Sequence, residues 1–372
     1  MELRPRNLVE MFDLAVSLYG RNFLVLVGIV AVTAVPLTLL QYPVTAIEQP
    51  QLDAAIRLLE HPEIAARQIP PGFNSPRAVA LSIVLTLLGY LVWAFCLAAI
   101  AEGVGRIYRA STIEFAACWQ AVLRRWLSIV SVLSLVVLAL VVCDATAVAL
   151  VTIVVSLAVV FAPASLPIMT VGAMLLVLLT LTLTPALLAM PCVFGFYGST
   201  LESLGAVAAL RLSFGRIFTR AEFRRSVICA TAVGTLAFGC SAVLGVFAIL
   251  GLARWTALYV AVDAVARTLL VPFIGLVLAL YYFDVRIRHE GFDLESGLDR
   301  ATVAGVAGEP AYAPTAYLSG AQRALVARFL ERRNGFSASR RDALAARLAQ
   351  PARARVPAEL QALDDESLLE RL

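Results

Sequence analysis

Long apolar runs separated by short polar segments dominate the chain. The runs cover residues 22–42, 78–101, 127 to about 150, 167–190, 226–250 and 258–283. Each is close to or longer than the ~20 residues that a helix needs to cross the hydrocarbon of a bilayer. Continuous hydrophobicity of this length predicts a membrane-spanning helix. The pattern therefore predicts an all-α, polytopic membrane protein with six transmembrane helices.

The stretch between Leu127 and Met190 allows two crossings or three, because Asp144 and the prolines near 165 interrupt it. The placement of the arginines favours two crossings. With a cytoplasmic N-terminus and six spans, the inner segments hold 12 arginines and the outer segments hold 4, as the positive-inside rule requires. We therefore expect three hairpins, both termini in the cytoplasm, and residues 145–165 as an outer helical extension or a half-buried hairpin.

An amphipathic stretch precedes the first, third and fifth spans, with apolar residues three or four apart. These stretches predict helices that lie on the inner membrane surface. Two of them follow a capping-box pattern. A threefold repeat of surface helix plus hairpin would explain this, and so would the ordinary composition of inward-facing loops. The apolar positions are Leu8, Phe12, Ala15 and Tyr19, then Phe115, Trp119, Val122 and Trp126, then Val207, Leu210, Phe214 and Ile217; the capping pairs are Ser111 with Glu114 and Ser199 with Glu202.

The composition changes after the last span. We divide the chain into a membrane domain at 1–290, a linker at 291–318 and a small cytoplasmic helical module at 319–372. The module is expected to hold one helix ending at Asn334-Gly335, a second that Pro351 and Pro357 end, and one more. Some 50 residues make a marginal core, so we expect a protein partner or self-association to complete it; a loosely ordered tail is the alternative.

Overall composition excludes a soluble globular protein. The chain is 60% hydrophobic and 15% charged, against ~45 to 50% and ~25% in soluble domains. All basic residues are arginine, which is typical of GC-rich bacterial genes and favours a bacterial inner membrane. Two histidines and six scattered cysteines offer no metal set. We expect no catalytic residue, metal, cofactor or nucleic-acid partner, and anionic lipids at the inner arginines.

Charged residues inside a span are costly, so Asp263 and Arg267 in the sixth span are the first candidates for function. Their four-residue spacing also allows a simple structural ion pair. The second candidate is the run from Tyr281 to Glu295. It predicts a membrane exit in which Asp284 pairs with Arg288 and Gly291 ends the helix. This run also contributes Arg286 and Glu290 to the candidate residues.

The same run resembles the F-D-x-R-x-R-x-E-G-F-D-L-E ending of bacterial glycerophosphoryl diester phosphodiesterase membrane domain proteins. Arg211 and Ser213 resemble a second motif of that family, whereas Leu212 stands where its second arginine is usual. The resemblance covers residues 5 to 295, and the tail from Leu318 is more weakly similar to tails of RDD-domain membrane proteins. The resemblance implies the membrane module without a catalytic barrel, which would need about 200 residues.

Three functions remain open at this point. The first is a non-enzymatic scaffold or accessory subunit of a membrane complex that uses the arginine-rich inner face and the tail for docking. The second is a transporter or lipid-handling protein that uses Asp263 and Arg267. The third is a membrane-bound hydrolase or transferase with Asp144, Glu60 or Glu63; no paired motif supports it.

Overall fold

The computed structural model describes residues 4–60, 76–109, 111–161, 172, 187–249, 256–295, 297–298, 318, 320–353 and 356–372. These residues form helices and their connections, with no strand among them. The all-α prediction is therefore confirmed for the described part of the chain. Contacts divide it into two compact units: unit 1 comprises Met1–Met11, Ile107–Ser111 and Leu280–Leu372, and unit 2 comprises Phe12–Arg106 and Thr112–Ala279.

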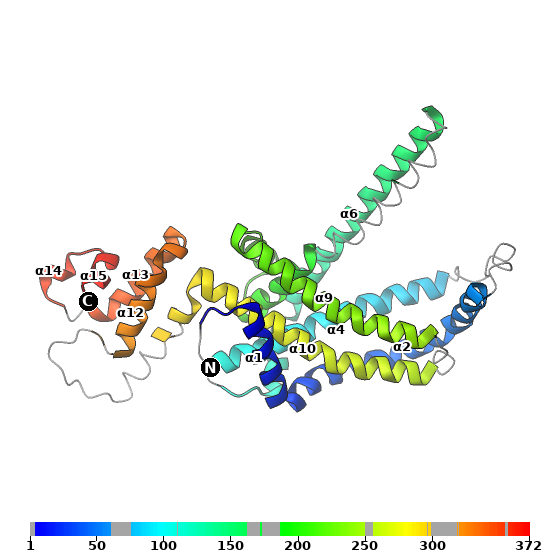
Figure 1. Cartoon of the computed structure of the whole chain (residues 1–372), viewed down its shortest axis with the longest axis horizontal. Helices are drawn as coiled ribbons and strands as arrows, with labels where there is room; N and C mark the ends of the chain where they lie inside the picture. The colour runs from blue at the N-terminus through cyan, green and yellow to red at the C-terminus, as the bar shows by residue number, and fades with distance from the viewer. Residues whose placement is uncertain are drawn as a thin grey trace. The chain divides into compact units, whose positions relative to one another are not determined.

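Long helices form the frame of the structure (Figure 1). They are α2 (Phe23–Glu60), α4 (Pro76–Tyr108), α6 (Trp126–Phe161), α9 (Arg220–Ile249) and α10 (Thr256–Glu290). Four segments among the described residues are long and apolar enough to cross a membrane: Phe23–Pro43, Ala80–Tyr108, Trp126–Ile153 and Val260–Glu290.

Four of the six predicted spans thus coincide with helices of membrane-spanning character. The predicted span at 167–190 lies mostly outside the described residues. The one at 226–250 falls on α9, which is helical but is not among the four candidates. Residues 145–161 continue α6 as one helix, which agrees with a helical extension of the third span.

Large apolar side chains are exposed on several of the long helices. Leu24 and Leu39 on α2 are 83% and 69% exposed, and Leu138 on α6 is 58% exposed. Exposed Leu and Val of this extent would cost free energy in water and are stable against hydrocarbon. The surface of these helices therefore has the character expected of a lipid-facing protein.

A short amphipathic helix stands directly before α2, α6 and α9. These are α1 (Leu8–Arg21), α5 (Phe115–Arg124) and α8 (Ala206–Ile217). The helices predicted from the pattern are confirmed as elements. In α1 the buried face includes Met11, Ala15 and Leu18, the same face as the predicted stripe. In α8 the buried residues are Ala209, Ser213, Arg216 and Ile217. Of the predicted stripe, Ile217 is therefore buried, whereas Val207 and Phe214 are exposed.

The two predicted capping boxes are wrong. Helix α5 begins at Phe115 with Glu114 at the N-cap and no side-chain cap. Ser199 lies inside the apolar helix Leu187–Leu201, where its hydroxyl donates to the Gly195 carbonyl at 2.9 Å. The motif failed there because a serine in an apolar helix satisfies its hydroxyl on its own backbone.

Helix α10 packs closely on α4 at Gly275. A Cβ atom at this position would lie 2.7 Å from Ile100 Cδ1 and 3.3 Å from Leu97 Cδ2. Small residues that let helix backbones approach are typical of packing between membrane helices. The glycine therefore sets the separation of these two helices within unit 2.

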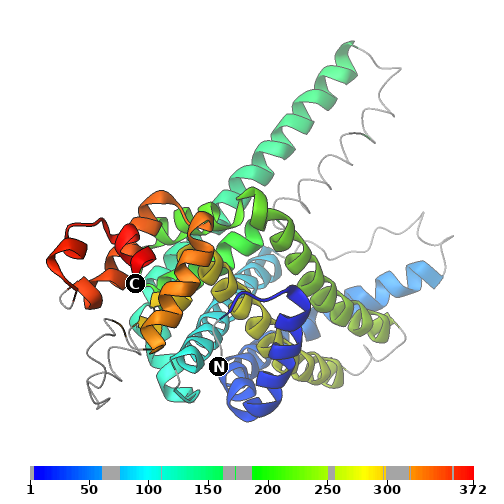
Figure 2. The same ribbon diagram turned by 60° about the vertical axis from the view of Figure 1, so that its left-hand side comes forward.

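The end of the chain folds into a small helical module with its own apolar core. It contains α12 (Gly320–Arg332), the 3₁₀ turn η3 (Arg333–Gly335), α13 (Ala338–Arg353), α14 (Ala358–Gln361) and α15 (Asp365–Arg371). Figure 2 shows these helices gathered at the orange-to-red end of the chain. The predicted helix end at Asn334-Gly335 is confirmed, whereas Pro351 lies inside α13 and does not end it.

The core of this module reaches back beyond residue 319. Leu294 and Leu298, in the segment expected as a linker, belong to one buried cluster with Leu325, Phe329 and Leu344. The remaining linker residues, 299–317, lie outside the described part. The residues that follow α10 therefore form part of the module they were expected only to connect.

Candidate functional site: a cavity that contains an ion pair

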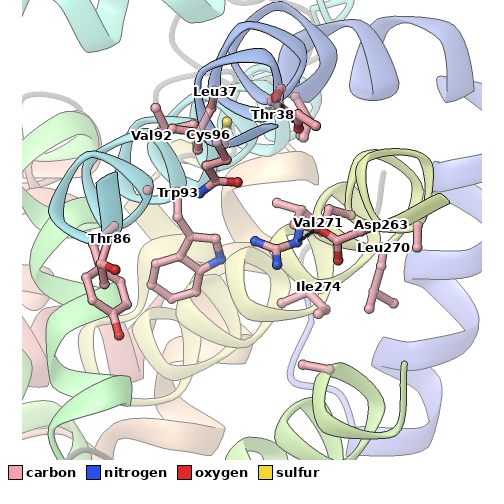
Figure 3. A pocket seen from close by; sticks show the side chains of 18 residues that line it. Leu37, Thr38, Thr86, Val92, Trp93, Cys96, Asp263, Leu270, Val271 and Ile274 are labelled. Carbon is pink, nitrogen blue, oxygen red and sulfur yellow. Dashed lines mark hydrogen bonds and ion pairs between the residues drawn. The ribbon is translucent and has the colours of Figure 1, made fainter. Parts of the chain in front are cut away.

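A cavity of about 600 Å³ lies among α2, α4, α9 and α10 in unit 2. This volume falls in the ~300 to 1,000 Å³ range of small-molecule sites. Figure 3 shows Trp93 of α4 and Asp263 of α10 projecting into it from different helices. The lining residues are Val30, Ala34, Leu37, Thr38 and Gln41 of α2; Thr86, Gly89, Tyr90, Val92, Trp93 and Cys96 of α4; Ala237 of α9; and Asp263, Ala266, Arg267, Leu270, Val271 and Ile274 of α10.

Asp263 and Arg267 form the ion pair that their spacing predicts. Arg267 Nε lies 2.8 Å from Asp263 Oδ2, one helical turn apart. The Asp263 side chain is 19% exposed and that of Arg267 is 61% exposed. Because an arginine carries five N–H donors, a contact through Nε leaves Arg267 able to meet a further acceptor. The pair is therefore both a local structural contact and an accessible polar group in the cavity.

Polar and apolar lining residues are separated along the helices. On α10, Asp263 and Arg267 precede the buried Ile274 by two to three turns. On α4, Thr86 and Tyr90 precede the buried Cys96 in the same way. The order along the chain is reversed on α2, where Thr38 and Gln41 follow the buried Val30.

All four helices contribute side chains to one cavity. One end of the cavity is thus polar and charged, whereas the other is a floor formed by the buried residues Val30, Cys96 and Ile274. This arrangement matches an amphiphile, a molecule with a polar head and an apolar body.

A second cluster of candidate residues lies in unit 1, around the end of α10. The Asp284 carboxylate is 4% exposed and receives the Arg6 backbone N–H at 2.7 Å and Arg288 Nε at 2.9 Å. Arg288 also donates through NH2 to the Arg6 carbonyl at 2.7 Å. The predicted Asp284–Arg288 contact is present, and both residues also hold the N-terminal segment. Their geometry is that of a structural clamp.

Arg286, Glu290 and Gly291 complete the end of the helix. Arg286 Nε lies 3.1 Å from Glu290 Oε2, and its guanidinium carbon lies 4.5 Å from the centre of the Phe292 ring. Helix α10 ends at Glu290, and Gly291 takes a φ of +63°, as a C-terminal glycine does. The three residues therefore shape the turn that leads from α10 into the module.

Further ion pairs join this turn to the module. Arg332 lies 2.7 Å from the buried Asp293, and Arg340 and Arg347 reach Glu295 at 2.9 and 2.8 Å. Burial raises the pKa of the Asp293 carboxyl above its ordinary value of 3.8, although Arg332 opposes this. The motif from Tyr281 to Glu295 thus holds unit 1 together.

Arg211 and Ser213 lie on α8, where Ser213 donates to the Ala209 carbonyl at 2.7 Å within its own helix. The more notable contact on this helix is one that sequence reasoning missed. Arg216 donates through both terminal nitrogens to Glu202, at 2.8 and 3.0 Å, and its side chain is 5% exposed. The sequence shows Arg216 on the same helix face as Ser213, which could have marked it as a buried arginine. No regular spacing along the chain indicates that its partner is Glu202.

Comparison with known proteins yields no match to a family model, to a curated protein or to a solved structure. Among the described residues, no three His, Cys, Asp or Glu side chains come together as a metal site. The physical properties of the cavity and of the unit 1 cluster therefore carry the functional argument.

Proposed function

We propose that the chain is a multi-pass protein of the bacterial inner membrane that binds an amphiphilic lipid in the cavity of unit 2. The observation that carries the proposal is the Asp263–Arg267 pair at the polar end of a cavity of about 600 Å³ with an apolar floor. The exposed Leu and Val side chains of α2 and α6 support the membrane location. The proposed role is lipid handling without a catalytic step.

The proposed orientation of the chain determines which leaflet the lipid headgroup would face. With a cytoplasmic N-terminus, the start of α4 and α10 and the end of the first span face the outside. The polar end of the cavity then lies at the level of the outer leaflet. A headgroup would contact Asp263 and Arg267, while acyl chains would lie toward Val30, Cys96 and Ile274.

A lipid fits this cavity better than a small polar solute does. A polar solute would leave the buried apolar floor without a partner, and burying polar groups there costs free energy unless each is hydrogen-bonded. An acyl chain gains free energy from the same surface, at ~25 cal/mol for each Å² removed from contact with water. The floor therefore selects for an apolar tail.

The test is the lipid that remains with the protein after extraction in polymer discs and mild delipidation. We expect about one lipid per chain to be retained, as measured by mass spectrometry. Ala266→Leu, which adds bulk to the cavity wall, should lower this occupancy. The matched control is Val265→Leu on the same helix, because Val265 is 58% exposed and does not line the cavity. Equal lipid retention by both variants and the wild type would overturn the proposal.

A docking role for the C-terminal module is the second candidate. The observation that favours it is a compact helical unit with its own core, which carries exposed arginines at Arg323 and Arg328 on α12. Deleting 319–372 would uncover Leu294 and Leu298, so a surface variant tests docking more cleanly. Arg323→Glu with Arg328→Glu should release a stoichiometric protein partner while the module stays folded. A partner retained by this variant would contradict docking through α12.

The family resemblance remains part of the proposal. We infer that the run from Tyr281 to Glu295 is the motif of that family and that it assembles the membrane exit. The contacts of Asp284, Arg288 and Gly291 support this role. A chain with Asp284→Asn should then lose stability in unit 1 while it retains lipid in unit 2. Loss of lipid without loss of stability would count against this assignment.

A further inference from the structure

We propose that the cavity of unit 2 selects a zwitterionic lipid headgroup, one that carries both an ammonium and a phosphate. This inference rests on the lipid-binding function proposed above and adds the chemical class of the headgroup. It follows from the charges in the lining. Asp263 and Arg267 are the charged residues among those that line the cavity, so the described lining holds one acid and one base.

A neutral pair is best matched by a ligand with two opposite charges. A phosphate that approaches Arg267 also approaches Asp263, because the two side chains are 2.8 Å apart. A purely anionic headgroup would place its negative charge close to that of Asp263, and like charges at this distance repel. An ammonium carried by the same headgroup removes this repulsion by pairing with Asp263.

The accessibility of the two side chains agrees with this arrangement. Arg267 is 61% exposed and so can take a phosphate, whereas Asp263 is 19% exposed and lies one turn nearer the start of α10. The guanidinium has the planar geometry that suits phosphate oxygens. An ammonium on a short linker could then reach Asp263 from the same headgroup.

Aromatic residues of α4 add a second reason to expect an ammonium. Trp93 projects into the cavity in Figure 3, and Tyr90, which also lines it, is 53% exposed. The faces of tryptophan and tyrosine attract cations. An anionic lipid without an amine would gain nothing from these rings.

The experiment compares phosphatidylethanolamine with phosphatidylglycerol that carries the same acyl chains. Binding of each lipid to the delipidated full-length protein is followed by native mass spectrometry. We expect the ethanolamine lipid to bind more tightly by on the order of tenfold, since a desolvated ion pair or cation–π contact contributes about that factor. Equal binding, or tighter binding of the glycerol lipid, would overturn the inference.

Variants separate the two charges. Asp263→Asn should abolish the preference for the ethanolamine lipid, and Arg267→Gln should weaken both lipids. The control is Asp144→Asn, because Asp144 is an acid on α6 that does not line the cavity; it should keep the preference. If Asp263→Asn kept the preference as well, Asp263 would not be the ammonium partner.

A charge exchange guards against variants that fail to fold. Asp263→Arg with Arg267→Asp retains one acid and one base on the same helical turn. It should restore the preference that Asp263→Asn loses, and failure to restore it in a folded protein would contradict the charge argument. Glycerophosphoethanolamine, which lacks acyl chains, should bind much more weakly than the lipid. Equally tight binding would identify a free headgroup as the ligand.

The outcomes distinguish this inference from the proposed function. If neither lipid binds and Ala266→Leu behaves as the wild type does, the lipid-binding function itself is wrong. If lipids bind in the cavity without regard to headgroup, the function stands and the zwitterionic selectivity is wrong.

Discussion

Gly291 occupies a position that another residue would strain. It follows the last residue of α10 with a φ of +63°, and a Cβ atom there would lie 2.8 Å from Leu344 Cδ1 and 3.4 Å from Phe336 Cζ. Leu344 and Phe336 belong to the core of the C-terminal module. Replacing Gly291 by alanine therefore tests both the turn and the packing of the module against it.

Two costs determine the expected effect of Gly291→Ala. A left-handed backbone costs a residue with a Cβ about 1 to 2 kcal/mol. Overpacking adds ~1 to 3 kcal/mol, and the lower part of this range applies because Leu344 Cδ1 is the far end of a side chain that can move. The free energy of unfolding of the module should thus fall by about 2 to 4 kcal/mol, which corresponds to an increase in opening of roughly 30- to 1,000-fold.

Hydrogen exchange of the full-length protein in lipid discs measures this opening at the amides of α13. Gly335→Ala is the matched control, since a Cβ atom there would meet nothing within 4 Å and should change stability by less than about 0.5 kcal/mol. Exchange in α13 that is equally fast in both variants would refute the reasoning from backbone conformation and contact.

Three further predictions concern packing, a buried ion pair and pH. Gly275→Ala should lower the free energy of unfolding of the membrane helices by ~1 to 3 kcal/mol. Adding Ile100→Val should recover part of this loss, because it removes the Cδ1 atom that the new Cβ would meet; no recovery would place the clash elsewhere. Glu202→Gln should lower the free energy of unfolding by about 3 to 5 kcal/mol, because Arg216 stays buried without its charged partner. Glu202→Leu with Arg216→Met should lower it by less, and the reverse order would contradict a dominant cost of burying the arginine charge. Burial raises the pKa of Asp293 in the folded chain, so the native carboxyl binds its proton more tightly than the unfolded one. The unfolding free energy of the wild type relative to Asp293→Asn should therefore fall as pH rises above about 3.8, and a constant difference would exclude this linkage.

Local features of the fold could be predicted from the sequence. The pairs Asp263–Arg267 and Asp284–Arg288 are visible because residues four apart meet on one face of a helix. The end of α10 at Gly291 follows from the conformational freedom of glycine. These predictions needed only the periodicity of the helix.

Contacts between distant segments could not be predicted in this way. Nothing in the local pattern indicates that Arg6 meets Asp284 or that Glu202 meets Arg216. The cavity could not be predicted either, because nothing distinguishes Trp93 from the other residues of its apolar run. Its place opposite Asp263 depends on how α4 and α10 pack, which the hydrophobic pattern leaves open.

The clamp between Arg6 and Asp284 has a consequence for the order of synthesis. These residues are 278 positions apart, so a ribosome working at about 5 to 20 residues per second reaches Asp284 roughly 15 to 60 s after Arg6. During that interval the N-terminal segment has no such anchor, and unit 1 is completed only after the last long helix has been made. The beginning of the chain is thus among the last parts to take its final place.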